Sequence, residues 1–210
     1  MGGSIVAVGV LATVLAGLAV LLWRGRSRGL EPELFAAHRE PRITSLPPQR
    51  VLQIVAPGDP NVVGPRVFGS LMRSYFRLRG VPKGGPSMPA PRARWTGDPG
   101  GASESWIGTY AMPVPEAAAA PAADPGAAWK VELATWDYGT VAESLHVGPY
   151  SAEGPALEEL RRYAERMGYV VSGEHEEEYV RGPGMVWRGD PRRYLTLLRY
   201  RVRPREAVAR

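Results

Sequence analysis

The stretches LHVGPY (residues 145–150) and GEHEEEY (residues 173–179) carry most of the information about the fold of this chain. The first ends in a Gly-Pro turn before a predicted helix, and the second lies in a predicted strand after that helix. Glutamate is a poor strand former and neighbouring like charges repel, so folding alone does not explain three consecutive glutamates in a strand. We therefore expect at least one of them to have a function.

The pattern around these stretches occurs twice along the chain. The first half predicts strands at 50–56, 89–95 and 103–114 with a helix at 62–79; the second predicts strands at 129–136, 140–147, 169–179 and 194–202 with a helix at 155–167. Gly-Pro opens each helix, at positions about 90 residues apart. The chain therefore predicts an α+β fold built from a duplicated β-α-β-β unit. Alanine- and proline-rich residues 116–128 are expected to connect the halves.

The two predicted helices differ in their apolar surfaces. The second has one apolar stripe and a charged opposite side, so it should lie on a sheet with one face in water. The first has an additional stripe formed by Phe68, Met72 and Phe76. That helix either packs between the sheet and a neighbouring helix or contacts a membrane or a protein partner.

The N-terminus predicts a membrane anchor. Residues 5–23 are apolar except for glycine and one threonine, and as a helix they would be about 28 Å long, which suits a bilayer. Trp23 and three closely spaced arginines follow the pattern of an interface anchor with a positive flank. Because the charge comes after the apolar run, we expect a retained anchor (1–23), a spacer (24–47) and a cytoplasmic domain, with an exported domain as the alternative.

Composition restricts the possible chemistry. The chain has 210 residues and no cysteine, which excludes disulfides and thiolate catalysis. Its three histidines are not spaced as metal ligands, so no metal site is expected. The net charge is +5, but no helix-turn-helix, zinc finger or aromatic-interleaved basic ribbon is present. We therefore expect no nucleic acid partner.

The two quoted stretches, Gly168-Tyr169 and a final strand with Thr196, Tyr200 and Val202 resemble the GyrI-like small-molecule-binding domain, the effector-binding module of multidrug-responsive transcription activators. Gly58-Asp59-Pro60-Asn61 resembles its stand-alone branch. The resemblance covers residues 48–203, with repeat one at 48–115, repeat two at 129–203 and a tail at 204–210. It departs from the family in the anchor and in Glu178, where members carry an apolar residue.

The resemblance implies two pseudo-symmetric β-α-β-β repeats of the SHS2 type. They would form one curved antiparallel sheet, with the helices on its outer side and a hydrophobic cleft on its concave side. It also implies bulky, flat, often cationic ligands and no cofactor or metal. Some stand-alone members hydrolyse cyclopropane-containing DNA-alkylating compounds.

Strand alternation selects one of the three glutamates. Glu177 shares a face with His175 and Tyr179, whereas Glu176 and Glu178 share the opposite face with Glu174, which we expect to be in water. In an apolar cleft Glu177 would have a raised pKa and could attract a cation or act as a base. Pairing of Glu177 with an arginine across the sheet is the structural alternative.

Other site residues are expected around Glu177. Tyr179 or Tyr150 would hydrogen-bond a substrate oxygen, although Tyr179 is equally compatible with a core role. Trp106 and Tyr110 would stack on a flat ligand. His146 matches a family position, but a histidine before a Gly-Pro turn is more often structural.

Three functions are compatible with these residues. The first is a membrane-tethered module that binds amphipathic or cationic small molecules. The second is a hydrolase of cyclopropanoid cytotoxins with Glu177 as base and Tyr179 as a second catalytic residue. The third is a membrane adaptor for a protein of unknown identity, which exposure of the second stripe of the first helix would favour.

Overall fold

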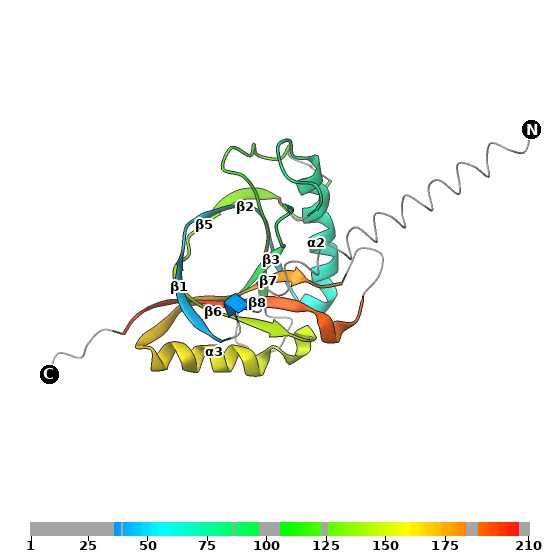
Figure 1. The fold of residues 1–210 in the computed structure, drawn as a ribbon. Coiled ribbons are helices and arrows are strands. Elements are labelled where there is room, and N and C mark those ends of the chain that lie inside the picture. Colours follow the sequence, from blue (N-terminus) through cyan, green and yellow to red (C-terminus); the bar gives the residue numbers. More distant parts are fainter. Residues whose placement is uncertain are drawn as a thin grey trace, which may run out of the picture.

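The computed structural model describes residues 36–38, 40–85, 87–96, 106–122, 126–183 and 189–205. Within these ranges an eight-stranded antiparallel sheet is flanked by two α-helices (Figure 1). The elements are β1 (Arg42–Leu46), β2 (Gln49–Pro57), α2 (Pro60–Arg77), β3 (Arg92–Thr96), β4 (Ile107–Pro113), β5 (Glu132–Trp136), β6 (Gly139–Val147), η2 (Tyr150–Ala152), α3 (Gly154–Arg166), β7 (Tyr169–Arg181), η3 (Pro191–Arg193) and β8 (Leu195–Pro204). The predicted α+β class and single antiparallel sheet are confirmed.

The sheet has an internal pseudo-twofold arrangement. Its strand order is β1-β6-β8-β7-β3-β4-β2-β5. If strands β1 to β4 of the first half are matched in sequence with β5 to β8 of the second, the order is the same when counted from either edge of the sheet. β3 and β7 pair at the centre. At the edges β1 pairs with β6 and β5 pairs with β2. Each half is therefore a β-β-α-β-β unit whose first strand is exchanged with the other half.

β1 changes the expected domain boundary. The sequence predicts a spacer up to residue 47, but β1 pairs with β6 from Arg42↔Glu143 to Leu46↔Gly139. The strand is five residues long and Pro47-Pro48 separates it from β2. Such a short edge strand lacks the long alternating pattern that marks strands in a sequence. The folded domain therefore begins by residue 42.

Two predicted segments are described only in part or not at all. The predicted anchor, residues 1–23, lies outside the described residues. In the part of the chain that the structure describes, no helix is both long and apolar enough to span a membrane. The predicted connector is described at 116–122 and 126–128, where it forms neither helix nor strand.

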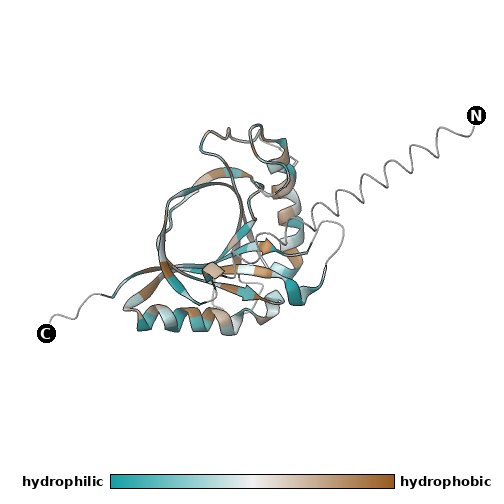
Figure 2. Ribbon diagram, in the orientation of Figure 1, coloured by the Kyte–Doolittle hydropathy of each residue, from teal (hydrophilic) through white to brown (hydrophobic). Residues whose placement is uncertain are grey.

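Both helices cover the same face of the sheet. The sheet curls into a ring, with α2 and α3 on the outside (Figure 1). α2 fully buries Val67, Leu71 and Tyr75 and packs against β2 and β4, while α3 buries Leu160 and Ala164 against β6, β7 and β8. Hydrophilic and hydrophobic residues alternate along α3 accordingly (Figure 2). Each large buried apolar side chain contributes about 1.5–3 kcal/mol, so these stripes hold the helices in place.

The second apolar stripe of α2 is not an exposed patch. Phe68, Met72 and Phe76 are half-buried and pack against the core between α2 and the sheet. Packing within the domain thus accounts for the additional stripe. This feature gives no support to the adaptor hypothesis.

Candidate functional site

Alternation along β7 divides its side chains between two faces. Opposite residues on neighbouring strands share a face, and Glu177 lies opposite Ala93 of β3 and Leu198 of β8, on the side of the helices. Glu176 and Glu178 point to the inner face instead. Glu176 is 3% exposed, so the prediction that these two glutamates face water is wrong. The curl of the sheet encloses this face. The alternation of residues along a strand does not reveal that curl.

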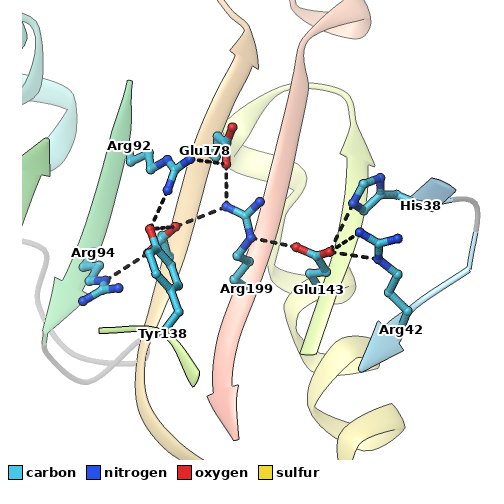
Figure 3. Close-up of polar contacts among 9 residues, drawn as sticks. His38, Arg42, Arg92, Arg94, Tyr138, Glu143, Glu178 and Arg199 are labelled. Atoms are coloured by element: carbon cyan, nitrogen blue, oxygen red, sulfur yellow. Dashed lines mark hydrogen bonds and ion pairs between the residues drawn. The ribbon is translucent and has the colours of Figure 1, made fainter. Parts of the chain in front are cut away.

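A ladder of alternating charges crosses five adjacent strands on the inner face (Figure 3). Its centre is Arg199 of β8. The Nε of Arg199 donates to Glu143 at 2.8 Å, and its Nη1 donates to Glu176 at 3.2 Å and Glu178 at 2.5 Å. We call this network the arginine–glutamate ladder; in strand order its members are Arg42, Glu143, Arg199, Glu176 with Glu178, and Arg94 with Arg92.

Further contacts complete the ladder. Arg42 donates to Glu143 at 2.6 Å, and Tyr138 donates to Glu176 at 2.9 Å. Burial opposes ionisation of Glu143, but Arg199 and Arg42 outweigh burial and lower its pKa. Among the described residues, the concave side therefore carries this charged network beside a buried cluster that includes Val51, Trp136 and Val141. The resemblance implies a hydrophobic ligand cleft on that side instead. The structural alternative for Glu177, pairing with an arginine across the sheet, is found instead for the adjacent Glu176 and Glu178.

Glu177 has different surroundings on the outer face. It is 9% exposed. Tyr179 donates to its Oε2 at 2.7 Å, and the Nε2 of His175 lies 3.2 Å from its Oε1. Among the ion pairs of the described residues, none joins Glu177 to arginine or lysine. A buried carboxylate without a strong cationic partner is unusual, because desolvation disfavours the charge.

A second carboxyl group, Glu153, is buried near Glu177. Glu153 immediately precedes α3 and is 4% exposed. Burial and the neighbouring Glu177 raise the pKa of Glu153 to about 8. Nothing in the local sequence marks Glu153 as buried, because a charged residue before a helix is ordinarily exposed. Glu153 makes no capping hydrogen bond and is turned into the protein.

Seven aromatic rings form a continuous band beside these two carboxyl groups. We call them the aromatic band. Each ring lies 5.0–6.0 Å from the next, measured between centroids, and most neighbours meet edge to face. Both halves of the chain contribute; in order the rings are Trp106, Trp95, Tyr110, Phe68, Tyr179, Tyr150 and Tyr194.

The phenols of the band are hydrogen-bond donors. Burial, followed by the charge of Glu177, raises the pKa of Tyr110 to about 12. Burial also raises the pKa values of Tyr150 and Tyr179. These groups therefore stay protonated near neutral pH. Tyr150 is 37% exposed, so the band reaches the surface there.

Several buried polar atoms along the band have unused hydrogen-bonding capacity. A buried polar group without a partner costs about 1–3 kcal/mol, so a group of them in one region is informative. In the described part of the chain, the atoms of this region that make no hydrogen bond are Glu153 Oε1, Thr196 Oγ1, Tyr110 Oη, Trp95 Nε1 and Trp106 Nε1. They offer both donors and an acceptor to a bound molecule.

The structure brings most of the predicted site residues together. Glu177, Tyr179, Tyr150, Tyr110 and Trp106 all lie in or against the aromatic band. The predicted His146 is not part of the band. Its Nε2 lies 3.2 Å from the carbonyl oxygen of Pro149, and the ring packs on Gly148, so it supports the turn. Among the described residues, no group of three or more side chains is arranged to hold a metal.

The fold is shared with known structures. No protein-family model and no curated protein sequence matches the chain. The structure of a hydrolase from Listeria innocua is 20% identical, with a TM-score of 0.64, over 84% of this chain and 98% of that chain. An uncharacterized conserved protein from Listeria innocua is also 20% identical, with the same coverage and a TM-score of 0.65. The EcmrR C-terminal domain is 14% identical over 79% of this chain and 98% of that chain, with a TM-score of 0.58. The chain therefore has the fold of the EcmrR C-terminal domain and of these Listeria proteins.

Proposed function

We propose that this protein binds lipophilic organic cations at the aromatic band, with Glu177 as the counter-charge. One contrast carries the proposal. On the inner face arginines hold two buried glutamates, Glu143 and Glu176, and the partly buried Glu178. On the outer face Glu177 and Glu153 pair with no arginine or lysine in the described ranges. A cation seated on the band would supply the missing positive charge.

The band suits a bulky, delocalised cation. A cation over an aromatic face is stabilised by about 0.5–2 kcal/mol, with the larger values at desolvated sites. Rings from two halves of the chain give the ligand more than one aromatic contact. The unused donors and acceptor would hold its polar groups.

The membrane tether remains part of the proposal. An anchor at residues 5–23 would hold the band on the cytoplasmic side, where it could intercept lipophilic cations that cross the bilayer. Reporter fusions at the C-terminus test this topology. A C-terminus found outside the cytoplasm would contradict it.

The binding test uses tetraphenylphosphonium and the full-length chain in detergent micelles. We expect saturable binding, and we expect Glu177→Gln to weaken it at least tenfold because the counter-charge is lost. Glu174→Gln is the matched control, since Glu174 lies on the same strand but is exposed. Equal affinities of the wild type and Glu177→Gln would refute Glu177 as the counter-charge.

Hydrolysis is the second candidate function, because two buried carboxyl groups lie beside the aromatic band and burial raises the pKa of one of them, Glu153. A site with one protonated and one ionised carboxyl group can act as acid and base. Glu177 would take a proton from water, whose oxygen bonds to a cyclopropane carbon as the ring bond breaks. The electron pair moves to the substrate oxygen, which accepts a hydrogen bond from Tyr179 and then a proton.

This activity is tested with a spirocyclopropyl cytotoxin. The expected result is addition of one water to the compound, detected by mass spectrometry and lost in Glu177→Gln. Turnover that persists in Glu177→Gln would show that another group is the base. Tetraphenylphosphonium binding without turnover of the cytotoxin would support the binding function and refute hydrolysis of this compound.

A further inference from the structure

One side of α2 carries arginines that the aromatic band does not use. Arg66, Arg73 and Arg77 recur at the spacing of one helix face, and Arg79 follows the end of the helix. All four residues are exposed. Residues 60–97 contain seven arginines and lysines but no aspartate or glutamate. This surface is therefore strongly basic.

The equivalent helix of the second half, α3, is balanced in charge. It contains three arginines and three glutamates, and two of its arginines form ion pairs with glutamates of the same helix. In the described part of the chain, no carboxylate pairs with the four arginines of the α2 surface. Arg73 instead donates to Ser70 at 2.9 Å, and the guanidinium of Arg66 lies 5.5 Å from the ring centre of Trp129. A solvated helix of this fold thus does not need an excess of positive charge, as α3 shows.

A groove of about 1280 Å³ lies between these arginines and the connector. The four arginines line one wall. The other wall comes from residues 117–122 and 126–131 and consists mostly of alanines together with Trp129. Lys130 also lines the groove but pairs with Glu132 at 2.7 Å. None of the described residues that line the groove is acidic, so it combines a basic wall with an apolar wall.

We propose that this groove binds an anionic phospholipid, with the phosphate on the arginines and an acyl chain along the apolar wall. Guanidinium groups match phosphate oxygens through paired hydrogen bonds. Ligand pockets commonly measure about 300–1,000 Å³, so the groove has room for a head group and a hydrocarbon chain. The apolar wall favours an amphiphile over a nucleic acid, which carries phosphates along its whole length. The protein would thus have a second site, whose charge preference is opposite to that of the aromatic band.

Native mass spectrometry of the full-length protein in neutral maltoside micelles tests this site. We expect the wild type to bind phosphatidylglycerol at least tenfold more tightly than phosphatidylcholine with the same acyl chains. Arg73→Gln combined with Arg77→Gln should remove this preference, because the phosphate loses two guanidinium partners. The control is Arg162→Gln combined with Arg166→Gln on α3, which changes the net charge equally at exposed positions and should keep the preference. Melting temperatures close to that of the wild type would show that both double variants fold.

Other outcomes would overturn the lipid site. Equal affinities of the wild type for the two lipids would do so, as would a preference that persists in the α2 double variant. Glycerol phosphate that binds as tightly as phosphatidylglycerol would identify a free phosphate ester as the ligand. A single-stranded oligonucleotide that binds more tightly than the lipid would identify a nucleic acid instead. Binding of phosphatidylglycerol without binding of tetraphenylphosphonium would support the lipid site and refute the cation-binding function, so the two proposals are tested separately.

Discussion

Adjacent glutamates in β7 have opposite environments. Glu176 lies inside the curl of the sheet with arginine partners, whereas Glu177 lies on the outer face with a tyrosine, a histidine and a second carboxyl group. Arg94 and Arg199 therefore both donate hydrogen bonds to the carboxylate of Glu176. The negative charge of Glu177 lacks such support in the described part of the chain, which makes this residue the better candidate for a ligand contact.

At the residue scale, Glu153 should make stability depend on pH. Its pKa is raised from an ordinary value of 4.5 to about 8, so between these pH values the folded protein binds more protons than the unfolded chain. The free energy of unfolding should therefore fall as pH rises, by up to about 1.4 kcal/mol per pH unit from this group. Glu153→Gln should flatten the slope.

Chemical denaturation at pH 5, 6, 7 and 8 measures this slope. Glu159→Gln should behave like the wild type, because Glu159 is exposed on α3. The contribution of Glu143 to the pH dependence of stability falls at lower pH, because the pKa of Glu143 is lowered rather than raised. Identical slopes for wild type and Glu153→Gln would mean that Glu153 has an ordinary pKa in the folded protein.

At the element scale, the arginine–glutamate ladder links five strands, and Arg199 at its centre joins three of them, β6, β8 and β7. Arg199→Leu should destabilise the protein by about 3–5 kcal/mol, because it leaves three largely buried carboxylates without their shared cation. Lower pH should restore part of the loss by protonating these carboxylates. Denaturation midpoints at pH 7 and pH 5 give both quantities.

The control for Arg199 lies on α3. Arg161 also pairs with two carboxylates, Glu158 at 2.8 Å and Glu165 at 2.7 Å, but its side chain is 44% exposed. Solvent screens such pairs, so Arg161→Leu should lower stability much less than Arg199→Leu does. Equal losses for the two variants would show that the ladder is no more important than a surface ion pair.

At the scale of the whole molecule, the exchanged edge strands couple the two halves. A fragment that begins at residue 49 lacks β1, which exposes the edge of β6 and removes Arg42 and His38 from Glu143. We expect this fragment to melt at a lower temperature and to associate through the open edge. A fragment that begins at residue 36 should stay monomeric.

Thermal melting and size-exclusion chromatography compare the two fragments. Both lack the predicted anchor, so a difference between them reports on residues 36–48. The same melting temperature and elution volume for both would show that β1 is dispensable. The domain would then begin at residue 48, as the sequence predicts.

Sequence patterns determined much of the architecture. Periods of two and of 3.6 residues located seven of the eight strands and both described α-helices, and the repeated Gly-Pro starts indicated the duplication. These signals are local, since each is contained in one element. The same local rule correctly placed Glu177 on one face with His175 and Tyr179, opposite Glu176 and Glu178.

Tertiary structure alone decided what each face of β7 meets. Alternation separates two faces but does not say which is enclosed, because that depends on the curl of the sheet and on partners such as Arg199 and Arg94. The pairing of β1 with β6 joins residues about 100 positions apart in the chain, and the fold also brings Glu153 near Glu177. Burial and charge pairing are properties of the assembled fold, and they make Glu177 the candidate site and its neighbours part of the core.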